Sequence, residues 1–266
     1  MLEILRQRRW WGFTAFILAM LVLCAILARW QWSRYQLRLA ENDRLDAALS
    51  APAVPVDELL DAAPADTAQG TTTAPALPAE LEWRTVTATG TFDAEAETAV
   101  RRRPLDGRNG FWIVTPLVTD SGVLLVNRGW APAGSDASTA PDIPAPPSGE
   151  VTVTGRLRPA EATAVTDAPP EGQAWATDPQ VLVTPDEVLR YNAYLQLTSS
   201  TPPADSELTS LSVPGHRGLN NLVYSVQWLI FGLVGLIGWW RLIRVESRRA
   251  EDADAVEADA AAEPAT

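Results

Sequence analysis

The residues able to do chemistry are few in this chain. All 21 basic side chains among its 266 residues are arginines, so the chain contains no lysine. This excludes a lysine nucleophile or base, a cofactor Schiff base and the lysine of a phosphate-binding loop. Any chemistry must therefore use one histidine, one cysteine, carboxylates, hydroxyls and arginines.

The chain has a single histidine, His216, and a single cysteine, Cys24, which further limits the catalytic and metal sites that it could form. A Ser-His-Asp triad would have to use His216, which lies beside an apolar run, and one chain with so few histidines and cysteines cannot assemble a multi-His or multi-Cys metal site. Cys24 lies inside another apolar run, has no intrachain disulfide partner and is typical of helix packing. We predict no catalytic residue, no metal site and no enzymatic activity.

Two long apolar runs, one near each end of the chain, are predicted to hold the segment between them at a membrane. Residues 222–240 carry no charge and are long enough, at about 1.5 Å per residue, to cross most of a ~30 Å hydrocarbon layer. Residues 10–28 form a matching run, bracketed by tryptophans as at the two headgroup layers. The predicted organisation is a cytoplasmic N-terminus (1–9), a first transmembrane helix (10–32), a juxtamembrane helix and Ala/Pro-rich linker (33–80), a β-rich domain (81–215), a second transmembrane helix with the segment leading into it (216–240), and a cytoplasmic acidic tail (241–266).

Arginines near the second run indicate its orientation. Four of them, Arg241, Arg244, Arg248 and Arg249, follow the run, whereas Arg217 alone precedes it closely. The positive-inside rule then predicts that both termini are cytoplasmic and that the central domain is extracytoplasmic. Since the lysine-free, Ala/Pro-rich composition is typical of a GC-rich bacterial genome, we predict a multi-pass protein of a bacterial cell membrane.

The charge of the central segment limits its partners. Residues 41–215 carry 10 Arg against 25 Asp and Glu, a net charge of −15. This excludes nucleic acid as a partner and argues against a domain that lies flat on anionic lipid. Residues 251–266 carry six acids and no base, which predicts a disordered extension.

Residues 30–42 are predicted to continue the first helix out of the membrane, with Arg34 and Arg38 on one face. Two interpretations stay open: this segment only positions the helix at the interface, or it docks a partner. Residues 56–60 predict one helical turn, and residues 61–80 predict a flexible linker.

A folded β-rich domain is expected from about Leu81. β-branched alternation and turn residues predict six strands, with residues 110–118 and 123–127 paired as a hairpin across a Thr-Asp-Ser-Gly turn. Residues 132–149 are predicted to form a Pro-rich connector with too few large apolar side chains to pack. Residues 185–190 are predicted to begin a short helix. The six strands are residues 82–93, 98–103, 110–118, 123–127, 151–158 and 193–199. We predict a β-rich α+β domain, a small antiparallel barrel or sandwich, flanked by two transmembrane helices.

Several motifs carry a family resemblance. The order WQWSR, EWRTVTATGTFD, RPLDGRNGFWIVTPL, VLLVNRGWAP, VTVTGRLRP and LVYSVQW resembles the Surfeit locus protein one family, assembly factors for haem-copper cytochrome c oxidase. The resemblance implies two membrane helices enclosing an extracytoplasmic β-rich domain. It implies as partners the catalytic subunit of the oxidase, other assembly factors and the lipid bilayer. The candidate partner-binding residues are Trp30, Gln31, Arg34, Arg128, Gly129, Trp130, Tyr224, Gln227 and Trp228.

The resemblance also raises a cofactor question. In several bacterial members a histidine about three residues before the tyrosine of the second helix is the proposed haem a ligand, but the corresponding residue here is Asn221. Asparagine is a poor haem ligand. His216, five residues further out, is either an ordinary interfacial histidine or a replacement ligand, so haem a is the one cofactor to test.

Three polar features have alternative interpretations. Arg128 either docks a partner or pairs with Asp106 or a backbone carbonyl at the turn, and residues 101–103, all arginine, are expected to be solvated or locally paired. Gln227 lies inside the second apolar run, so its amide is expected to seek a hydrogen bond with the first helix or with an oxidase subunit.

These observations predict a non-enzymatic membrane assembly factor for haem-copper cytochrome c oxidase, assisting haem a insertion or stabilising the catalytic subunit. The alternative is a haem a-binding carrier. A membrane-anchored hydrolase is disfavoured by the missing lysine and the solitary histidine.

Overall fold

The computed structural model describes residues 8–60, 75–134, 141–162, 165–183, 189–204 and 207–262. The chain forms two compact units, one made of Met1–Asn42 with Gly215–Thr266 and one made of Asp43–Pro214. The first unit contains a pair of long helices, and the second is a β-rich domain. Each is described separately below.

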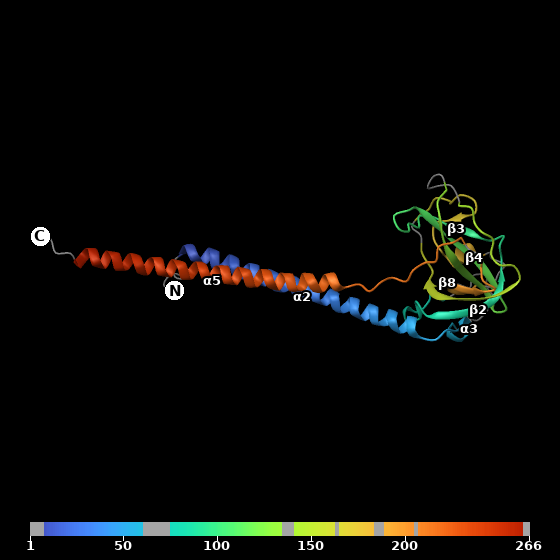
Figure 1. Cartoon of the computed structure of the whole chain (residues 1–266), viewed down its shortest axis with the longest axis horizontal. Helices are drawn as coiled ribbons and strands as arrows, with labels where there is room; N and C mark the ends of the chain where they lie inside the picture. The colour runs from blue at the N-terminus through green and yellow to red at the C-terminus, as the bar shows by residue number, and fades with distance from the viewer. Residues whose placement is uncertain are drawn as a thin grey trace. The chain divides into compact units, whose positions relative to one another are not determined.

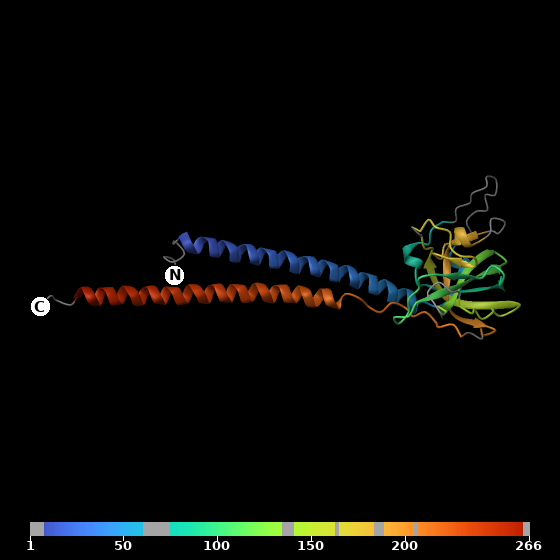
Figure 2. The ribbon, with the colours of Figure 1, turned by 90° about the horizontal axis from the view of Figure 1, so that it is seen from above.

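The helical unit pairs α2 (Arg8–Ser50) with α5 (Leu219–Ala262), which run side by side in opposite directions (Figures 1 and 2). Ser225 Oγ donates to the Ala28 carbonyl oxygen at 3.0 Å, and Trp239 Nε1 donates to Thr14 Oγ1 at 3.2 Å. By length and composition, both helices are able to cross a membrane. Their apolar windows are only 11% and 6% buried, so these side chains lack the protein cover that a soluble core helix has.

Small residues let the two helices approach. Cys24 and Ala28 are buried on α2, and the Cβ position of Gly232 lies 3.6 Å from Leu21 and 3.7 Å from Cys24. In an apolar solvent the hydrophobic effect does not drive helices together. Helices there commonly pack through small side chains, which allow close van der Waals contact between the backbones. Cys24 therefore has a packing role, as predicted.

The β-rich domain is built from short elements. In chain order they are β1 (Val54–Pro55), α3 (Val56–Leu59), the 3-10 helix η1 (Ala79–Leu81), β2 (Thr85–Phe92), β3 (Thr98–Val100), β4 (Gly110–Thr119), β5 (Gly122–Pro132), β6 (Glu150–Pro159), β7 (Gln173–Ala174), α4 (Pro179–Leu182) and β8 (Leu189–Thr201). All six predicted strands are present, and β4 and β5 form the predicted hairpin.

Five strands close into a small barrel in the order β2, β6, β8, β5, β4 and back to β2. Closure removes the open edges that five long strands would otherwise expose. The barrel is not purely antiparallel, because β5 pairs with β8 in parallel. The expectation of an antiparallel barrel or sandwich is thus confirmed as a barrel but corrected in strand direction.

Glycines allow the tightest approaches in the barrel. An ideal Cβ at Gly90 would lie 2.2 Å from the Val118 carbonyl oxygen, and one at Gly155 would lie 2.4 Å from the Gln196 carbonyl oxygen. Gly90 lies beside the seam where Thr91 pairs with Val118 and closes the ring. Any larger residue would push the two strands of this seam apart.

Several boundaries differ from the predictions. The folded domain was expected from about Leu81, but Val56 and Leu60 are buried in its core and Leu77 packs against it. A helical turn at residues 56–60 is confirmed as α3. Residues 61–74 of the predicted linker lie outside the described residues. The remainder is not a free linker, since Ala76 pairs with Asn192 in β8.

Three further expectations were wrong in part. Residues 132–149 do pack, because Ala133 and Ile143 lie against buried residues of the domain. The predicted helix at 185–190 falls mostly outside the described residues, and its last two residues belong to β8. A short helix, α4, is described just before this segment, where Asp178 Oδ1 accepts from Gln180 N at 3.0 Å in front of Pro179. The expected disorder of the tail is wrong for residues 251–262, which continue α5.

Candidate functional site

The most distinctive family-like motif, residues 126–130, contains a β-bulge. Ile113 pairs with Gly129 and Val114 pairs with Asn127, so Arg128 is the extra residue on β5. Gly129 has a φ of +147°, a left-handed value that a residue with a side chain rarely adopts. The bulge therefore breaks the alternation of the strand and turns Arg128 into the domain.

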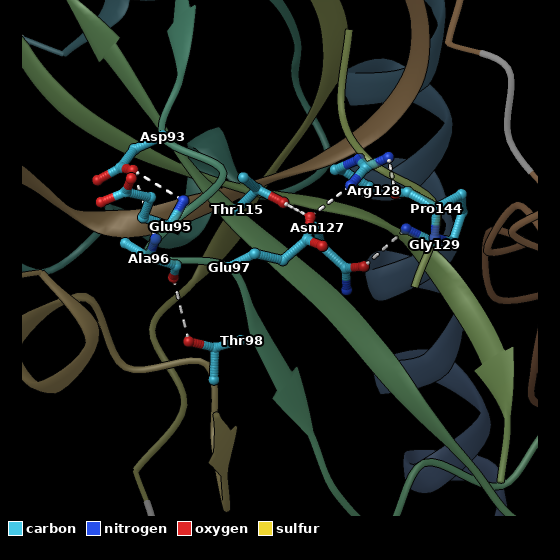
Figure 3. A network of polar contacts seen from close by, with 10 residues as sticks. All are labelled: Asp93, Glu95, Ala96, Glu97, Thr98, Thr115, Asn127, Arg128, Gly129 and Pro144. Carbon is cyan, nitrogen blue, oxygen red and sulfur yellow. Dashed lines mark hydrogen bonds and ion pairs between the residues drawn. The ribbon is translucent and has the colours of Figure 1, made fainter. Parts of the chain in front are cut away.

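Arg128 is held in a buried polar network (Figure 3). Its Nη1 donates to Glu97 Oε2, and its Nη2 donates to the Pro144 carbonyl oxygen at 2.8 Å. Thr115 Oγ1 donates to the same Glu97 oxygen at 2.5 Å. The Arg128 side chain is 1% exposed and that of Glu97 11% exposed, so this ion pair is shielded from water.

The loop before β3 places Glu97 in this network. Asp93 Oδ1 accepts from the backbone nitrogens of Glu95 and Ala96 at 3.0 and 3.4 Å, and Thr98 Oγ1 donates to the Ala96 carbonyl oxygen at 3.2 Å. These short-range bonds fold residues 93–98 so that the Glu97 carboxylate faces β4 and β5 (Figure 3). Such a turn built by an aspartate side chain is a local sequence effect.

Two polar groups of the network remain unsatisfied in the described part of the chain. Asn127 Oδ1 accepts from Gly129 N at 3.1 Å, but Asn127 Nδ2 and Arg128 Nε are buried without a partner. A buried ion pair gives little net stability but is costly to break. The network therefore fixes the geometry of the bulge and holds Arg128 inside the described domain.

Trp130, next in the motif, is also buried, and it supports a loop on the surface. Its Nε1 donates to the Arg103 carbonyl oxygen at 2.6 Å, and the Arg108 guanidinium carbon lies 5.7 Å from its ring centroid. Gly110 leaves room for this ring, since a Cβ there would lie 2.3 Å from it. Trp130 thus lies under the turn formed by residues 101–110.

The predicted roles of the motif residues change accordingly. Arg128 pairs with Glu97 and not with Asp106, although the expected backbone carbonyl contact exists at Pro144. Arg128, Gly129 and Trp130 are all buried in the described structure, and their role in binding a partner stays a prediction. Sequence reasoning missed Glu97 and Thr115, and nothing in their local pattern distinguishes them from other surface-type residues.

The predicted partner-binding residues on α2 and α5 differ in exposure. Trp30 and Tyr224 are about half exposed, and Arg34 is exposed. Trp228 is partly buried and stacks edge-on against Phe231 with centroids 5.8 Å apart. Gln31 differs from these, because its Oε1 is buried without a partner in the described structure.

Gln227 makes no hydrogen bond to the described residues of the first helix, which was one of its two expected partners. It is partly buried and has no hydrogen bond to a described residue, whereas Ser225, two residues earlier, bonds across to α2. Ser225 was missed because a serine in a helix commonly bonds within its own helix. The alternative, a hydrogen bond from the Gln227 amide to an oxidase subunit, stays a prediction.

His216 lies in the segment that leads into α5 and is exposed. This segment is fixed by Asn42, whose Nδ2 donates to the Arg217 carbonyl oxygen at 2.9 Å and whose Oδ1 accepts from Arg217 N at 3.2 Å. Asn221 lies in the first turn of α5, where its backbone nitrogen donates to the Gly218 carbonyl oxygen at 2.9 Å.

Asn221 does not fit a haem site, and the role of His216 as a replacement ligand stays a prediction. The axial ligands of haem iron are a histidine nitrogen, a cysteine or methionine sulfur or a tyrosine oxygen, and the Asn221 side chain offers none of these. His216 is exposed on the segment that leads into α5. Among the described residues, no group of three or more His, Cys, Asp or Glu could hold a metal ion.

The fold and site define a protein of two long apolar helices that flank a small closed β-barrel, with a buried Glu97–Arg128 pair behind a surface turn. The chain matches the model of the SURF1 family over residues 18–233, which include most of both apolar runs and the whole barrel. SURF1-like proteins of Mycobacterium bovis and Mycobacterium tuberculosis are each 30% identical over 260 residues, or 95% of this chain and 90% of the relative. This protein belongs to the SURF1 family.

Proposed function

We propose that this protein is a non-enzymatic membrane assembly factor for haem-copper cytochrome c oxidase, which assists haem a insertion or stabilises the catalytic subunit. The observation that carries the proposal is family membership over residues 18–233. The family is one of oxidase assembly factors, and the match includes the helices as well as the domain. The scarcity of lysine, histidine and cysteine supports a role without covalent catalysis.

The membrane arrangement is part of the proposal. Both α2 and α5 cross the cell membrane, both termini are cytoplasmic and the barrel is extracytoplasmic. The exposed apolar windows of the helices and the arginines after Trp240 support it. In this arrangement the partners are the catalytic subunit, other assembly factors and the bilayer.

Contacts with the catalytic subunit are proposed along the helix pair. Trp30 and Tyr224 offer aromatic surface, Arg34 offers charge, and Gln227 offers an amide without a described partner. An amide in hydrocarbon gains from a hydrogen bond to a neighbouring helix. Trp228 adds apolar contact area next to it.

The test compares membranes of cells with and without this protein. The haem a absorbance and oxidase content should fall in the deletion strain and return when the gene is restored. Unchanged oxidase in the deletion strain would contradict the proposed function.

Two variants separate the scaffold from a haem a carrier. In membranes with matched amounts of this protein, His216→Ala should leave the haem a absorbance intact, because an exposed interfacial imidazole contributes little that alanine cannot replace. Gln227→Leu combined with Trp228→Ala should lower it while the protein stays in the membrane. If His216→Ala loses the haem a absorbance while the double variant keeps it, the scaffold function is wrong and the protein is a haem a carrier.

A further inference from the structure

A tight turn gathers the arginines of an otherwise acidic domain. Residues 101–110 contain four of the ten arginines in residues 41–215, where 25 Asp and Glu give a net charge of −15. Arg103 N donates to the Gly110 carbonyl oxygen at 3.0 Å, and Leu105 and Arg108 bond reciprocally at 3.0 and 2.9 Å. We call residues 101–110 the basic hairpin.

Two of the four guanidiniums are already engaged with the domain. Arg101 Nη1 donates to Gln173 Oε1, and Arg103 Nη2 donates to Glu161 Oε2. These bonds attach the basic hairpin to the strand β7 and to the segment after β6. They confirm local pairing for two of the three residues at 101–103.

The other two guanidiniums, those of Arg102 and Arg108, face solvent. Both residues are exposed, and neither forms an ion pair with a described carboxylate. The one carboxylate within the basic hairpin, Asp106, is also exposed and has no described ion pair. The surface of the hairpin therefore keeps an excess of positive charge.

Aromatic rings hold these two arginines in place. The Arg102 guanidinium carbon lies 4.7 Å from the Trp175 ring centroid, and that of Arg108 lies 5.7 Å from Trp130. A guanidinium stacked on an indole keeps its edge donors free, and it loses less rotamer freedom when it binds a carboxylate.

The backbone at Arg102 adds a second, independent sign. Its φ is +58°, in the left-handed region that residues other than glycine seldom occupy. Such a conformation persists only where the surroundings impose it, and it is common at binding sites. Here it directs Arg102 to the Trp175 ring and away from the pairs made by Arg101 and Arg103.

We infer that the basic hairpin is a docking surface for an acidic segment of a partner protein, whose carboxylates pair with the guanidinium edges of Arg102 and Arg108. Arginine binds carboxylates in a bidentate, directional way. The inference rests on the proposed function, in which the partner is a component of oxidase assembly. It also links the buried residues 126–130 to binding, because Trp130 holds the basic hairpin through its hydrogen bond to the Arg103 carbonyl oxygen.

A protein partner fits better than an anionic lipid surface. The domain around the hairpin carries a large net negative charge, which a flat anionic membrane would repel as a whole. A narrow acidic segment can reach two neighbouring arginines without approaching the rest of the domain.

The test uses the full chain in nanodiscs of neutral phosphatidylcholine and a fluorescent octaglutamate peptide as the probe. Anisotropy should show binding that weakens as salt is raised. Arg102→Glu with Arg108→Glu should raise the dissociation constant roughly tenfold or more, as expected for the reversal of two exposed charges. Arg102→Gln with Arg108→Gln should give an intermediate value.

Arg44→Glu is the control for a charge reversal outside the basic hairpin, because Arg44 is also an exposed arginine. It should leave the peptide affinity unchanged, and an octaglutamine peptide should not bind. Equal weakening in Arg44→Glu and the double reversal would overturn the inference, as would no binding to the wild-type protein. Loss of binding to phosphatidylglycerol vesicles with unchanged peptide affinity would assign the hairpin to lipid and also overturn it.

A cellular arm distinguishes this inference from the proposed function. At matched protein level, the double reversal should lower oxidase content and Arg44→Glu should not. If oxidase falls in the deletion strain but is normal in the double reversal, the docking surface is wrong and the proposed function stands. If the deletion strain keeps its oxidase, the proposed function is wrong. The peptide affinities alone then decide whether the basic hairpin binds an acidic segment.

Discussion

The Trp130 indole nitrogen lies 2.6 Å from the carbonyl oxygen of Arg103, so one hydrogen bond links the barrel strand β5 to the basic hairpin. Trp130→Phe keeps an aromatic ring but removes the donor and part of the ring volume. The domain should lose about 1–3 kcal/mol of its free energy of unfolding. Trypsin should also cut faster between Arg108 and Asn109, which reports the loosened hairpin directly. An unchanged cutting rate would show that the hairpin does not depend on Trp130.

Arg128→Met should be among the most destabilising substitutions in the domain. It leaves the Glu97 carboxylate, 11% exposed, without its cation. Breaking a buried pair in this way costs about 3–5 kcal/mol, which urea unfolding of the detergent-solubilised protein would measure. The pair Arg128→Met with Glu97→Gln should regain part of that loss. Arg44→Met, at an exposed site, should stay within about 0.5 kcal/mol of wild type.

Gly90→Ala should open the seam that closes the barrel. The added Cβ would lie 2.2 Å from the Val118 carbonyl oxygen, so one strand must move. Overpacking of this kind costs about 1–3 kcal/mol, and the melting temperature should fall by several degrees. Gly215→Ala, with no atom within 4 Å of its Cβ position, is the control and should melt like wild type.

Tyr194 should make the domain less stable in alkali. Burial raises the pKa of this phenol above its ordinary value of 10.0, and the Glu161 carboxylate raises it further against the opposing effect of Arg158. Because the folded state holds the proton to higher pH than the unfolded chain, this stability is fully present below pH 10.0. It is lost as pH rises through the higher folded pKa. Urea unfolding at pH values on both sides of 10.0 should show the decline, and Tyr194→Phe should reduce it.

The proposed topology predicts the behaviour of reporter fusions. A reporter that is active only outside the cytoplasm should work when fused after Gly149 and should fail when fused after Arg249. This expectation rests on the arginines that follow the second apolar run. The opposite pattern, with fusion proteins of equal abundance, would contradict it.

Local patterns in the sequence predicted the strands well. The β4–β5 hairpin is typical, because alternating β-branched residues and a Thr-Asp-Ser-Gly turn specify both the pairing and its register. The helix start at Asp178 was missed although it carries the same cap and proline signals as the one predicted at Thr184. Two equal local signals a few residues apart cannot be ranked without their tertiary contacts.

Long-range features were not accessible to such reasoning. Nothing near Val56 or Leu60 indicates that these residues join the barrel core, since their partners lie on strands far along the chain. The same holds for the partner of Arg128. Asp106 was the nearer carboxylate along the chain, but the bulge at Gly129 turns Arg128 toward Glu97. A bulge of this kind changes which face a side chain takes, and strand periodicity does not reveal it.

The order in which the barrel closes has a consequence for folding. The ring needs β8 (Leu189–Thr201) between β5 and β6, yet β8 is the last strand to be synthesised. The earlier strands therefore cannot complete their pairing while most of the chain is being made, and the contacts that close the ring are far apart in sequence. Such topologies fold slowly, over milliseconds to seconds. A chain that stops before β8 would keep the edges of β5 and β6 open and would be a target for aggregation or proteolysis.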